Sequence, residues 1–350
     1  MPSGWDAWPV RTTAPVSASQ TTTLQDWVEE SIPATSGTVQ TLVSLCQGVL
    51  VRPAAGLPLP LSHGPYEAEV VTVGACLRTL TRDGVDLVAG WPAGEMCASS
   101  RGAVMMPWVN RVGDGRYELG GRTYQLALSE PAKGNAIHGL VHWVPWTVAE
   151  HGTDHATLRY ELPPQSGYPW LLDLEVAYRL DDDGLTVTLG ATNVGDTAAP
   201  YGAGLHPYLT VGRRVDECVL TLPAESWCAM DERGLPSPAV PVDDTQWDFR
   251  DGRAIGDLVI DHPFGGVADG ATATLADADT GRSVSLTVHE GVRWLHAFTG
   301  DTVRGHEREA LAVEPVTAPP DSFRTGVDLV TLAPGESHRA SFTIAGVTGS

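Results

Sequence analysis

Apolar and polar side chains alternate along much of this chain with a period of two residues. In the segment 172–180, Leu-Asp-Leu-Glu-Val-Ala-Tyr-Arg-Leu, apolar side chains recur at every second position, a pattern typical of a strand with one buried face. Four residues that favour a turn follow at 181–184, and the segment 185–189 resumes the alternation. We therefore predict a β-hairpin over residues 172–189.

The same design recurs along the chain, and turn residues at 277–281 separate two of the further segments. The further strand-like segments are 67–73, 124–128, 157–162, 217–222, 271–275, 283–288 and 341–344. After residue 66, no long segment with the 3.6-residue period of a helix interrupts them. Many short strands joined by Gly, Pro and Asp turns predict an all-β fold, a large antiparallel β-sandwich.

The first 60 residues differ from the rest of the chain. The segment 12–23 is rich in Ser, Thr and Ala and has no period, while 24–30 and 38–51 are candidates for short helices. Three prolines then punctuate the chain. We predict an N-terminal extension over residues 1–60, partly disordered or formed of short helices, and one β-sandwich domain over residues 61–350.

The chain is strongly acidic. Its 350 residues include 43 acidic and 22 basic side chains, a formal net charge of −21. This charge repels nucleic acids and anionic membranes, so we expect neither as a partner. The sequence has no apolar run of the roughly 18 residues that a membrane helix needs, and its first residues lack the pattern of a normal secretory signal, so we expect none. Five scattered cysteines without a C-x-x-C pair are typical of reduced thiols. We predict a cytoplasmic monomer or homodimer.

Motifs for the common cofactors are absent from the sequence. There is no GxxxxGK[ST] loop, no GxGxxG motif opening a helix and no GxSxG motif. The pairs His138/His142 and His151/His155 have a spacing that aligns metal ligands only on a helix, and both lie in strand-like surroundings. We therefore predict neither a cofactor nor a metal.

Six polar residues stand out because their neighbours are apolar or rich in Gly and Pro. They are Asn110, Arg111, His138, His206, Asp261 and Glu314. Burial at the end of an apolar strand would raise the pKa of Glu314 toward that of a useful base. Taken singly, each residue has an ordinary interpretation as a surface charge, a core histidine, a turn former or a member of an ion pair.

Taken in order, these residues form a series of motifs. The series reads Asn110-Arg111, Gly115-Arg-Tyr-Glu-Leu-Gly-Gly-Arg-Thr-Tyr-Gln-Leu126, Asn135-Ala-Ile-His138-Gly139, His206-Pro-Tyr208, Asp261-His-Pro-Phe264 and Glu314-Pro-Val-Thr-Ala-Pro-Pro-Asp-Ser-Phe323. It resembles the aldose 1-epimerase (galactose mutarotase) family over about residues 60–346. The resemblance implies a β-sandwich fold, which agrees with the strand pattern. It also implies that residues 61–350 are a catalytic domain whose substrate is a small sugar.

The resemblance implies a role for each matched residue. Glu314 would be the general base that removes the proton from the anomeric hydroxyl O1, and His206 the general acid that protonates the ring oxygen. The opened ring would then reclose as the other anomer. Arg111, His138, Asp261 and Asn110 would bind the sugar hydroxyls. One acid and one base suffice for this chemistry, which needs no cofactor.

Other functions remain open at this point. A hexose-6-phosphate 1-epimerase would need arginines near the sugar's C6, for which Arg213, Arg214 and Arg293 are available, although the net charge disfavours such a substrate. A non-catalytic carbohydrate-binding protein or sensor on the same fold would bind sugar without exchanging its anomers. A glycoside hydrolase would use Asp261 and Glu314 as its two carboxylates.

Two positions depart from the family's pattern. Leu140 stands where the family often has a second glycine, and Leu209 where it often has phenylalanine. These departures leave the identity of the sugar open. Trp108 and Trp294 are candidates to stack on the sugar.

Overall fold

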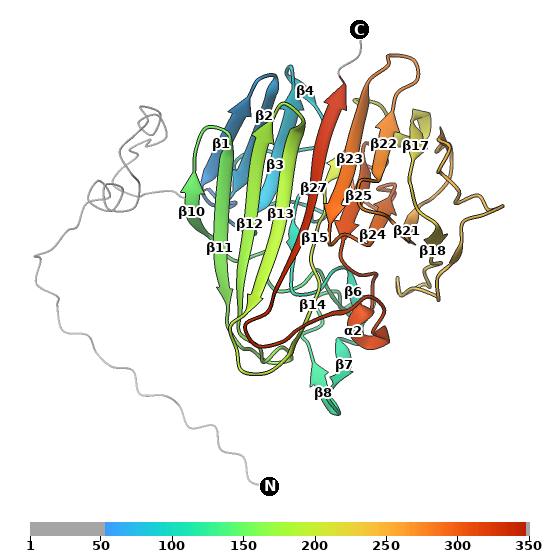
Figure 1. Cartoon of the computed structure of the whole chain (residues 1–350). Helices are drawn as coiled ribbons and strands as arrows, with labels where there is room; N and C mark the ends of the chain where they lie inside the picture. The colour runs from blue at the N-terminus through green and yellow to red at the C-terminus, as the bar shows by residue number, and fades with distance from the viewer. Residues whose placement is uncertain (1–52, 348–350) are drawn as a thin grey trace, which may run out of the picture. The chain divides into compact units, whose positions relative to one another are not determined.

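The hairpin expected from the alternating pattern lies inside a nine-stranded antiparallel sheet. Its strands, β12 (Leu172–Asp181) and β13 (Gly184–Asn193), pair from Leu172 opposite Asn193 to Asp181 opposite Gly184. The structure is a computed structural model that describes residues 53–347 (Figure 1). The helices expected at 24–30 and 38–51 lie outside the described residues. The first described strand already begins at Pro58, just before the expected domain boundary.

The nine strands run in the order β10-β11-β12-β13-β27-β23-β22-β17-β20. The remaining members are β10 (Thr147–His151), β11 (His155–Leu162), β17 (Val219–Thr221), β20 (Arg253–Ala254), β22 (Thr272–Ala276), β23 (Ser283–Glu290) and β27 (Ser337–Val347). Strands β22 and β23 form the second expected hairpin. The C-terminal strand β27 pairs with β13 on one side and with β23 on the other, so it joins the two hairpins into one sheet (Figure 1).

Two smaller sheets make up the second layer. One is the four-stranded sheet β1 (Pro58–His63), β2 (Tyr66–Val71), β3 (Cys76–Arg82) and β4 (Val85–Asp86). The other has eight strands, with the path β19-β18-β21-β24-β25-β15-β5 and β16 also paired to β25. Its strands are β5 (Val104–Met105), β15 (Gly204–Leu205), β16 (Tyr208–Leu209), β18 (Ser226–Trp227), β19 (Val240–Pro241), β21 (Asp261–Gly265), β24 (Trp294–Phe298) and β25 (Leu311–Val316).

The main core lies between the two layers. From the large sheet, alternate residues of β12, such as Val176 and Tyr178, are fully buried in it. Val70 meets them from the four-stranded sheet, and Leu295 and Val313 extend the same core in the eight-stranded sheet. Each fully buried aliphatic side chain stabilises the fold by about 1.5–3 kcal/mol. The predicted all-β antiparallel fold is confirmed.

Strand β25 differs from the alternating strands because all six of its residues are buried. Leu311 and Val313 belong to the main core, whereas Ala312 and Val316 pack in two small apolar clusters on the other face. Because side chains alternate along a strand, Glu314 shares that second face. The fold therefore places a carboxylate at a position that is only 1% exposed.

Short elements complete the described chain. They are β6 (Arg111–Gly113), β7 (Arg116–Leu119), β8 (Arg122–Gln125), β9 (Asn135–Ile137), β14 (Ala199–Tyr201), β26 (Val330–Leu332), the 3-10 turn η2 (Val215–Glu217) and the helix α2 (Ser322–Thr325). β6 pairs with β9, β7 with β8, and β14 with β26. Between residues 53 and 347 we find no helix with the length and apolar character that crossing a membrane requires.

Candidate active site

Three neighbouring strands of the eight-stranded sheet place polar side chains beside one another. On β24, His296 lies directly opposite Glu314 of β25. On the next strand, β21, the Oδ1 atom of Asp261 lies 2.8 Å from Nε2 of His296, within hydrogen-bond distance. Like Glu314, His296 is only 1% exposed. A carboxylate, an imidazole and a second carboxylate thus follow one another across β21, β24 and β25.

His206 approaches Glu314 from the other side of β25. It lies between β15 and β16, two short strands that both pair with β25. Its backbone N–H donates to Ala103 and its carbonyl accepts from Gly102, which fixes the loop. The Nε2 atom of His206 is 3.2 Å from Oε1 of Glu314, and its ring stacks on Tyr208 with centroids 5.0 Å apart. The acid and the base expected from the sequence are therefore in contact.

The β6–β9 pair brings Asn110, Arg111 and His138 to the same place. Arg111 begins β6, and its partner Ile137 ends β9, so Asn110 and His138 flank the end of the ladder. The backbone N–H of His138 donates to the carbonyl of Asn110 at 2.9 Å. Both residues have left-handed backbone angles, with φ values of 47° and 59°, a strained conformation that concentrates at functional sites. The His138 ring lies 5.4 Å from that of His206.

Local sterics explain the glycine that follows His138. Gly139 has a φ of 75°, and a Cβ there would overlap the backbone of Met106. The next residue, Leu140, donates its N–H to the Met106 carbonyl at 2.7 Å and packs against the main core. Leu209 is buried in β16 opposite Leu311. Both departures from the family's pattern are therefore apolar packing positions.

Arg111 is held by a carboxylate that the sequence motifs do not include. Its Nε and Nη2 atoms donate to the two oxygens of Glu130, at 2.9 and 3.1 Å. Asn135 donates to Glu130 as well, at 2.9 Å. Gly234, with a φ of 72°, lies so close that a Cβ there would be 2.6 Å from Nη1 of Arg111. The remaining Nη1 atom makes only a long 3.5 Å contact with Asn110.

The surroundings shift the pKa values of these groups in opposite directions. Burial raises the pKa of Glu314 to about 7, as expected for a carboxyl at the end of an apolar strand. Burial lowers the pKa of His206 to about 3. Because these two side chains are in contact, their titrations belong to the pair, which holds one proton between those values. In the free site the shifts favour that proton on Glu314.

The pKa values of Asp261 and His296 shift in a different way from those of Glu314 and His206. Burial opposes ionisation of Asp261, but the hydrogen bond with His296 and the charges of His296 and Arg111 outweigh it, so its pKa falls to about 2. Burial also lowers the pKa of His296, yet the charge of Glu314 and the bond to Asp261 outweigh that effect and raise it. Both shifts favour an ionised Asp261 beside a protonated His296.

We refer to Arg111, His138, His206, Asp261, His296 and Glu314 as the polar cluster. Several of its buried atoms have no hydrogen-bond partner among the described protein groups. They are Nδ1 of His138, Nδ1 of His206, Nδ1 of His296 and Oε2 of Glu314. An unpaired buried polar atom costs about 1–3 kcal/mol, so these atoms are suited to a polyhydroxylated ligand. No group of His, Cys, Asp or Glu between residues 53 and 347 has the geometry to hold a metal ion.

Two members of this arrangement, His296 and Glu130, were not found from the sequence. His296 lies in a short apolar strand, where a single histidine has no pattern that separates it from an ordinary core residue. Glu130 lies in a loop, and its pairing with Arg111 depends on the β6–β9 contact. Only the tertiary structure brings both residues to the polar cluster.

Comparison with known proteins identifies the family of this chain. The model of the family described as aldose 1-epimerase matches residues 59–345. This chain belongs to the aldose 1-epimerase family. It is also 37% identical over 303 residues to the Escherichia coli K12 protein YihR, covering 86% of this chain and 97% of YihR. The mouse galactose mutarotase is 28% identical over 161 residues, which are 43% of this chain and 45% of the mouse protein.

Solved structures share the fold of this epimerase-family protein. An aldose epimerase homologue from C. elegans has a TM-score of 0.74 at 21% identity, covering 83% of this chain and 99% of that one. A galactose 1-epimerase from Lactobacillus acidophilus has a TM-score of 0.72 at 22% identity, covering 83% and 94%. The galactose mutarotase-like fold expected from the motifs is therefore confirmed.

The tryptophans considered for stacking on the sugar already pack against protein groups. In this epimerase-family protein, Trp108 is 2% exposed and its ring lies against that of Phe323. Trp294 donates its Nε1–H to Asp328 at 2.7 Å, and its ring lies close to Gly265. Both indole rings are therefore used in contacts within the protein.

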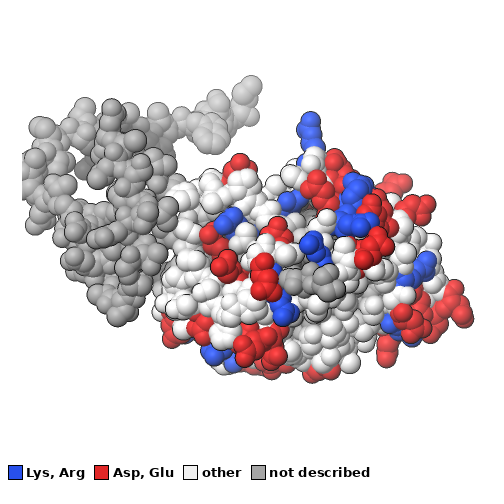
Figure 2. Space-filling view, turned by 90° about the horizontal axis from the view of Figure 1, so that it is seen from above, with Lys and Arg blue, Asp and Glu red and all other residues white. Residues whose placement is uncertain are grey.

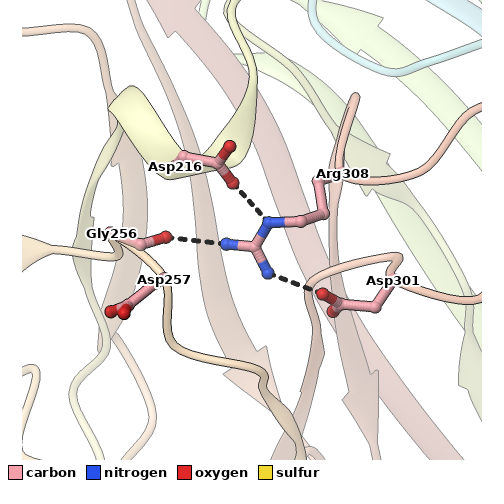
Figure 3. Close-up of a pocket in the computed structure, with 5 residues that line it drawn as sticks. All are labelled: Asp216, Gly256, Asp257, Asp301 and Arg308. Atoms are coloured by element: carbon pink, nitrogen blue, oxygen red, sulfur yellow. Dashed lines mark hydrogen bonds and ion pairs between the residues drawn. The ribbon is translucent and has the colours of Figure 1, made fainter.

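A surface pocket of about 320 Å³ contains none of the predicted site residues (Figure 3). Arg308 lies at its centre and pairs with Asp216 and, at 2.8 Å, with Asp301. It also donates to the carbonyls of Gly256 and Leu258, at 2.7 and 3.1 Å. Most of its N–H groups are thus used within the protein. This pocket surrounds an internal ion-pair network that ties three loops of the epimerase-family domain together.

The arginines considered for a phosphate group face carboxylates. Arg213 pairs with Glu217 at 2.5 Å, and Arg214 pairs with Asp216 at 3.1 Å. Arg293 lies 3.9 Å from Asp269. On the face seen in Figure 2, basic side chains likewise lie among acidic ones. The three arginines give no support to a phosphorylated substrate for this family member.

Proposed function

We propose that this protein is an aldose 1-epimerase that interconverts the α and β anomers of a free, unphosphorylated hexose such as galactose or glucose. The observation that carries the proposal is the contact between Glu314 and His206, a buried carboxyl and a buried imidazole 3.2 Å apart. In a pyranose, O1 and O5 are both bonded to C1. An acid and a base that are neighbours can therefore serve both oxygens at once.

The proton movements balance over the two groups. Ionised Glu314 takes the proton from the O1 hydroxyl while the C1–O5 bond breaks, and protonated His206 gives its proton to O5. The products are the open-chain aldehyde, protonated Glu314 and neutral His206. After rotation about C1–C2, His206 takes the proton back from the O5 hydroxyl. Glu314 returns its proton to O1, and the ring closes as the other anomer.

The rest of the site supports a polar, uncharged substrate. Arg111 keeps one guanidinium nitrogen free of close partners while Glu130 holds the others. Asp261, ionised and half-buried, is an acceptor for sugar hydroxyls. His138 is kept neutral by burial, which lowers its pKa, so it can bond a hydroxyl without adding charge. Together these groups match several hydroxyls of a hexose.

The relatives support the same substrate class. The mouse protein carries the name galactose mutarotase, and the Lactobacillus acidophilus structure is named galactose 1-epimerase. Their names motivate galactose as the first sugar to test. Since the arginines available for a phosphate group pair with carboxylates, we propose the free sugar rather than its 6-phosphate.

Polarimetry on freshly dissolved sugars tests the proposal. The full chain should speed the decay of optical rotation of α-galactose or α-glucose, and the rate should scale with enzyme concentration. Turnover of glucose 6-phosphate, measured by exchange NMR, should be lower. A full chain that binds these sugars but leaves the rate of anomer exchange unchanged would instead be a non-catalytic sugar-binding protein.

A further inference from the structure

His296 is the one imidazole of the polar cluster that the sequence motifs did not include. It lies on β24, between Asp261 of β21 and Glu314 of β25. It is almost completely buried, and its Nε2 atom contacts Asp261 at 2.8 Å. The proton transfers proposed above do not use it. His296 therefore lies beside the proposed base without a role in the proton transfers.

We propose that His296, anchored by Asp261, is a positioning residue whose positive charge stabilises the ionised form of the Glu314 carboxyl, the form that acts as a base. The effect of the His296 charge on the rate of anomer exchange rests on the proposed function. The relation itself concerns only the charge states of two side chains, so it can be measured without any substrate.

The strand register supports a through-space interaction between the two residues. Directly opposite residues of an antiparallel pair have Cβ atoms about 4.5–5.5 Å apart and share one face of the sheet. His296 and Glu314 are such a pair. An opposite charge at this range favours the ionised form of a carboxyl, and the effect is strong where water is excluded. Among the charges acting on Glu314, that of His296 is the largest.

The anchor explains why the positive charge stays on His296. Nε2 faces the Asp261 carboxylate, which favours the doubly protonated ring. The titratable and charged groups that face the ring come from several elements. They are Asp261 and His262 on β21, Glu314 on β25, Arg111 on β6, His206 between β15 and β16, and His138 after β9. Both carboxylates favour the doubly protonated ring of His296. The positive charge of Arg111 disfavours it, but the carboxylate of Glu130, bonded to Arg111 through both of its oxygens, offsets that charge.

The other histidines of the polar cluster do not carry such a charge. Burial lowers the pKa of His138 and of His206, and neither has a carboxylate as closely bonded as Asp261 is to His296. The carboxyl that His206 contacts is that of Glu314, with which it shares a proton. His296 is therefore the histidine of this cluster that is suited to a fixed positive charge.

Carboxyl NMR on the full chain, labelled with 13C in its glutamate side chains, tests the relation directly. The Glu314 resonance is assigned by its loss in Glu314→Gln. In His296→Gln, which removes the charge and keeps a hydrogen-bond donor for Asp261, the titration midpoint of Glu314 should rise by about one pH unit. The matched control is His262→Gln, which removes a half-buried imidazole from the same sheet and should leave the midpoint unchanged. An unchanged midpoint in His296→Gln overturns the proposal.

A measurement on the unmodified protein covers the case in which His296→Gln does not fold. 15N NMR of the histidine rings reports how many nitrogens of His296 carry a proton. The ring should remain doubly protonated at the pH at which Glu314 loses its proton. If His296 is singly protonated there, the proposal is wrong.

Kinetics separate this inference from the proposed function. If the full chain exchanges anomers, the pH above which kcat/KM falls should rise by about one unit in His296→Gln and stay in place in His262→Gln. Anomer exchange without any such shift overturns the role of His296 alone. The opposite result is a protein that does not exchange anomers but in which His296→Gln still shifts the titration midpoint of Glu314. That result overturns the epimerase function and upholds the effect of the His296 charge on Glu314.

Discussion

Nε2 of His206 and Oε1 of Glu314 lie 3.2 Å apart although the two residues belong to distant parts of the chain. The contact follows from sheet topology. Strands β15 and β16, on either side of His206, both pair with β25, which carries Glu314. The loop that holds the imidazole is therefore fixed at two points against the strand that holds the carboxyl. A single unit of the fold thus sets the geometry of the proposed acid–base pair.

Removing the carboxyl should abolish the proposed reaction while the protein stays folded. In Glu314→Gln the side chain keeps its size but cannot accept the O1 proton. Because a positioned general base contributes about 10²–10⁴-fold to rate, we expect the polarimetric rate to fall by at least about 100-fold. Circular dichroism should be unchanged. A variant with wild-type activity would show that Glu314 is not the base.

The activity should fall as the pH rises above about 7. The reaction needs one proton on the Glu314–His206 pair, and the pair keeps one proton between pKa values of about 3 and about 7. We expect kcat/KM to be flat between about pH 4 and 6.5 and to drop about tenfold per unit well above pH 7. Polarimetry at constant ionic strength measures this profile. A kcat/KM that rises through pH 7 would mean that ionised Glu314 acts without a proton on His206.

The same carboxyl should make stability depend on pH with a definite sign. Burial raises the pKa of Glu314 from 4.5 to about 7, so between these values the folded protein holds a proton that the unfolded chain releases. This contribution to stability is complete below about pH 4.5 and is lost as the pH rises through 7. Glu314→Gln should therefore be more stable than the wild type at pH 8 by roughly 3 kcal/mol, and equally stable at pH 4.5. Denaturant unfolding at pH 4.5 and at pH 8 measures the difference in stability between the two proteins. The same difference at both pH values would contradict the prediction.

Loosening Arg111 should weaken sugar binding more than it slows turnover. Glu130→Gln removes the charge that holds two guanidinium nitrogens in place. We expect KM to rise about tenfold, corresponding to about 1.4 kcal/mol of lost binding, with kcat within about threefold of the wild type. Glu175→Gln, which breaks an exposed ion pair with Arg159 on the large sheet, is the control and should leave both constants unchanged. A fall in kcat at constant KM would argue against this role.

The Arg308 network should contribute to stability. Arg308→Gln leaves Asp216 and Asp301 without their cation, and the arginine side chain is only 12% exposed (Figure 3). We expect a loss of about 2 kcal/mol of unfolding free energy in denaturant titrations. Arg250 also pairs with two aspartates but is 39% exposed, so Arg250→Gln should cost less than about 1 kcal/mol. Equal losses in the two variants would show that burial does not decide the effect.

Much of the fold could be predicted from the sequence because local pattern encodes it. The alternation at 172–180 and 185–189 gave β12 and β13 as a hairpin, and that at 283–288 gave β23, because a sheet with one buried face requires this period. The segment 217–222 was less regular. Only Val219–Thr221 is strand, and residues 215–217 form a 3-10 turn. Pattern alone could not give the insertion of β27 between two hairpins, because its partners are far away in sequence.

For the site, the sequence by itself determined which residue types are present and in what order, including Glu314, His206, Asp261 and Arg111. It also determined the family, because these motifs are spaced along most of the chain. Only the tertiary structure decided how the residues meet. The contact of His206 with Glu314, and the place of His296 between Asp261 and Glu314, depend on which strands are neighbours. The physical reason is that packing over the whole domain sets strand order and burial, and burial together with the neighbouring charges sets the pKa of each group.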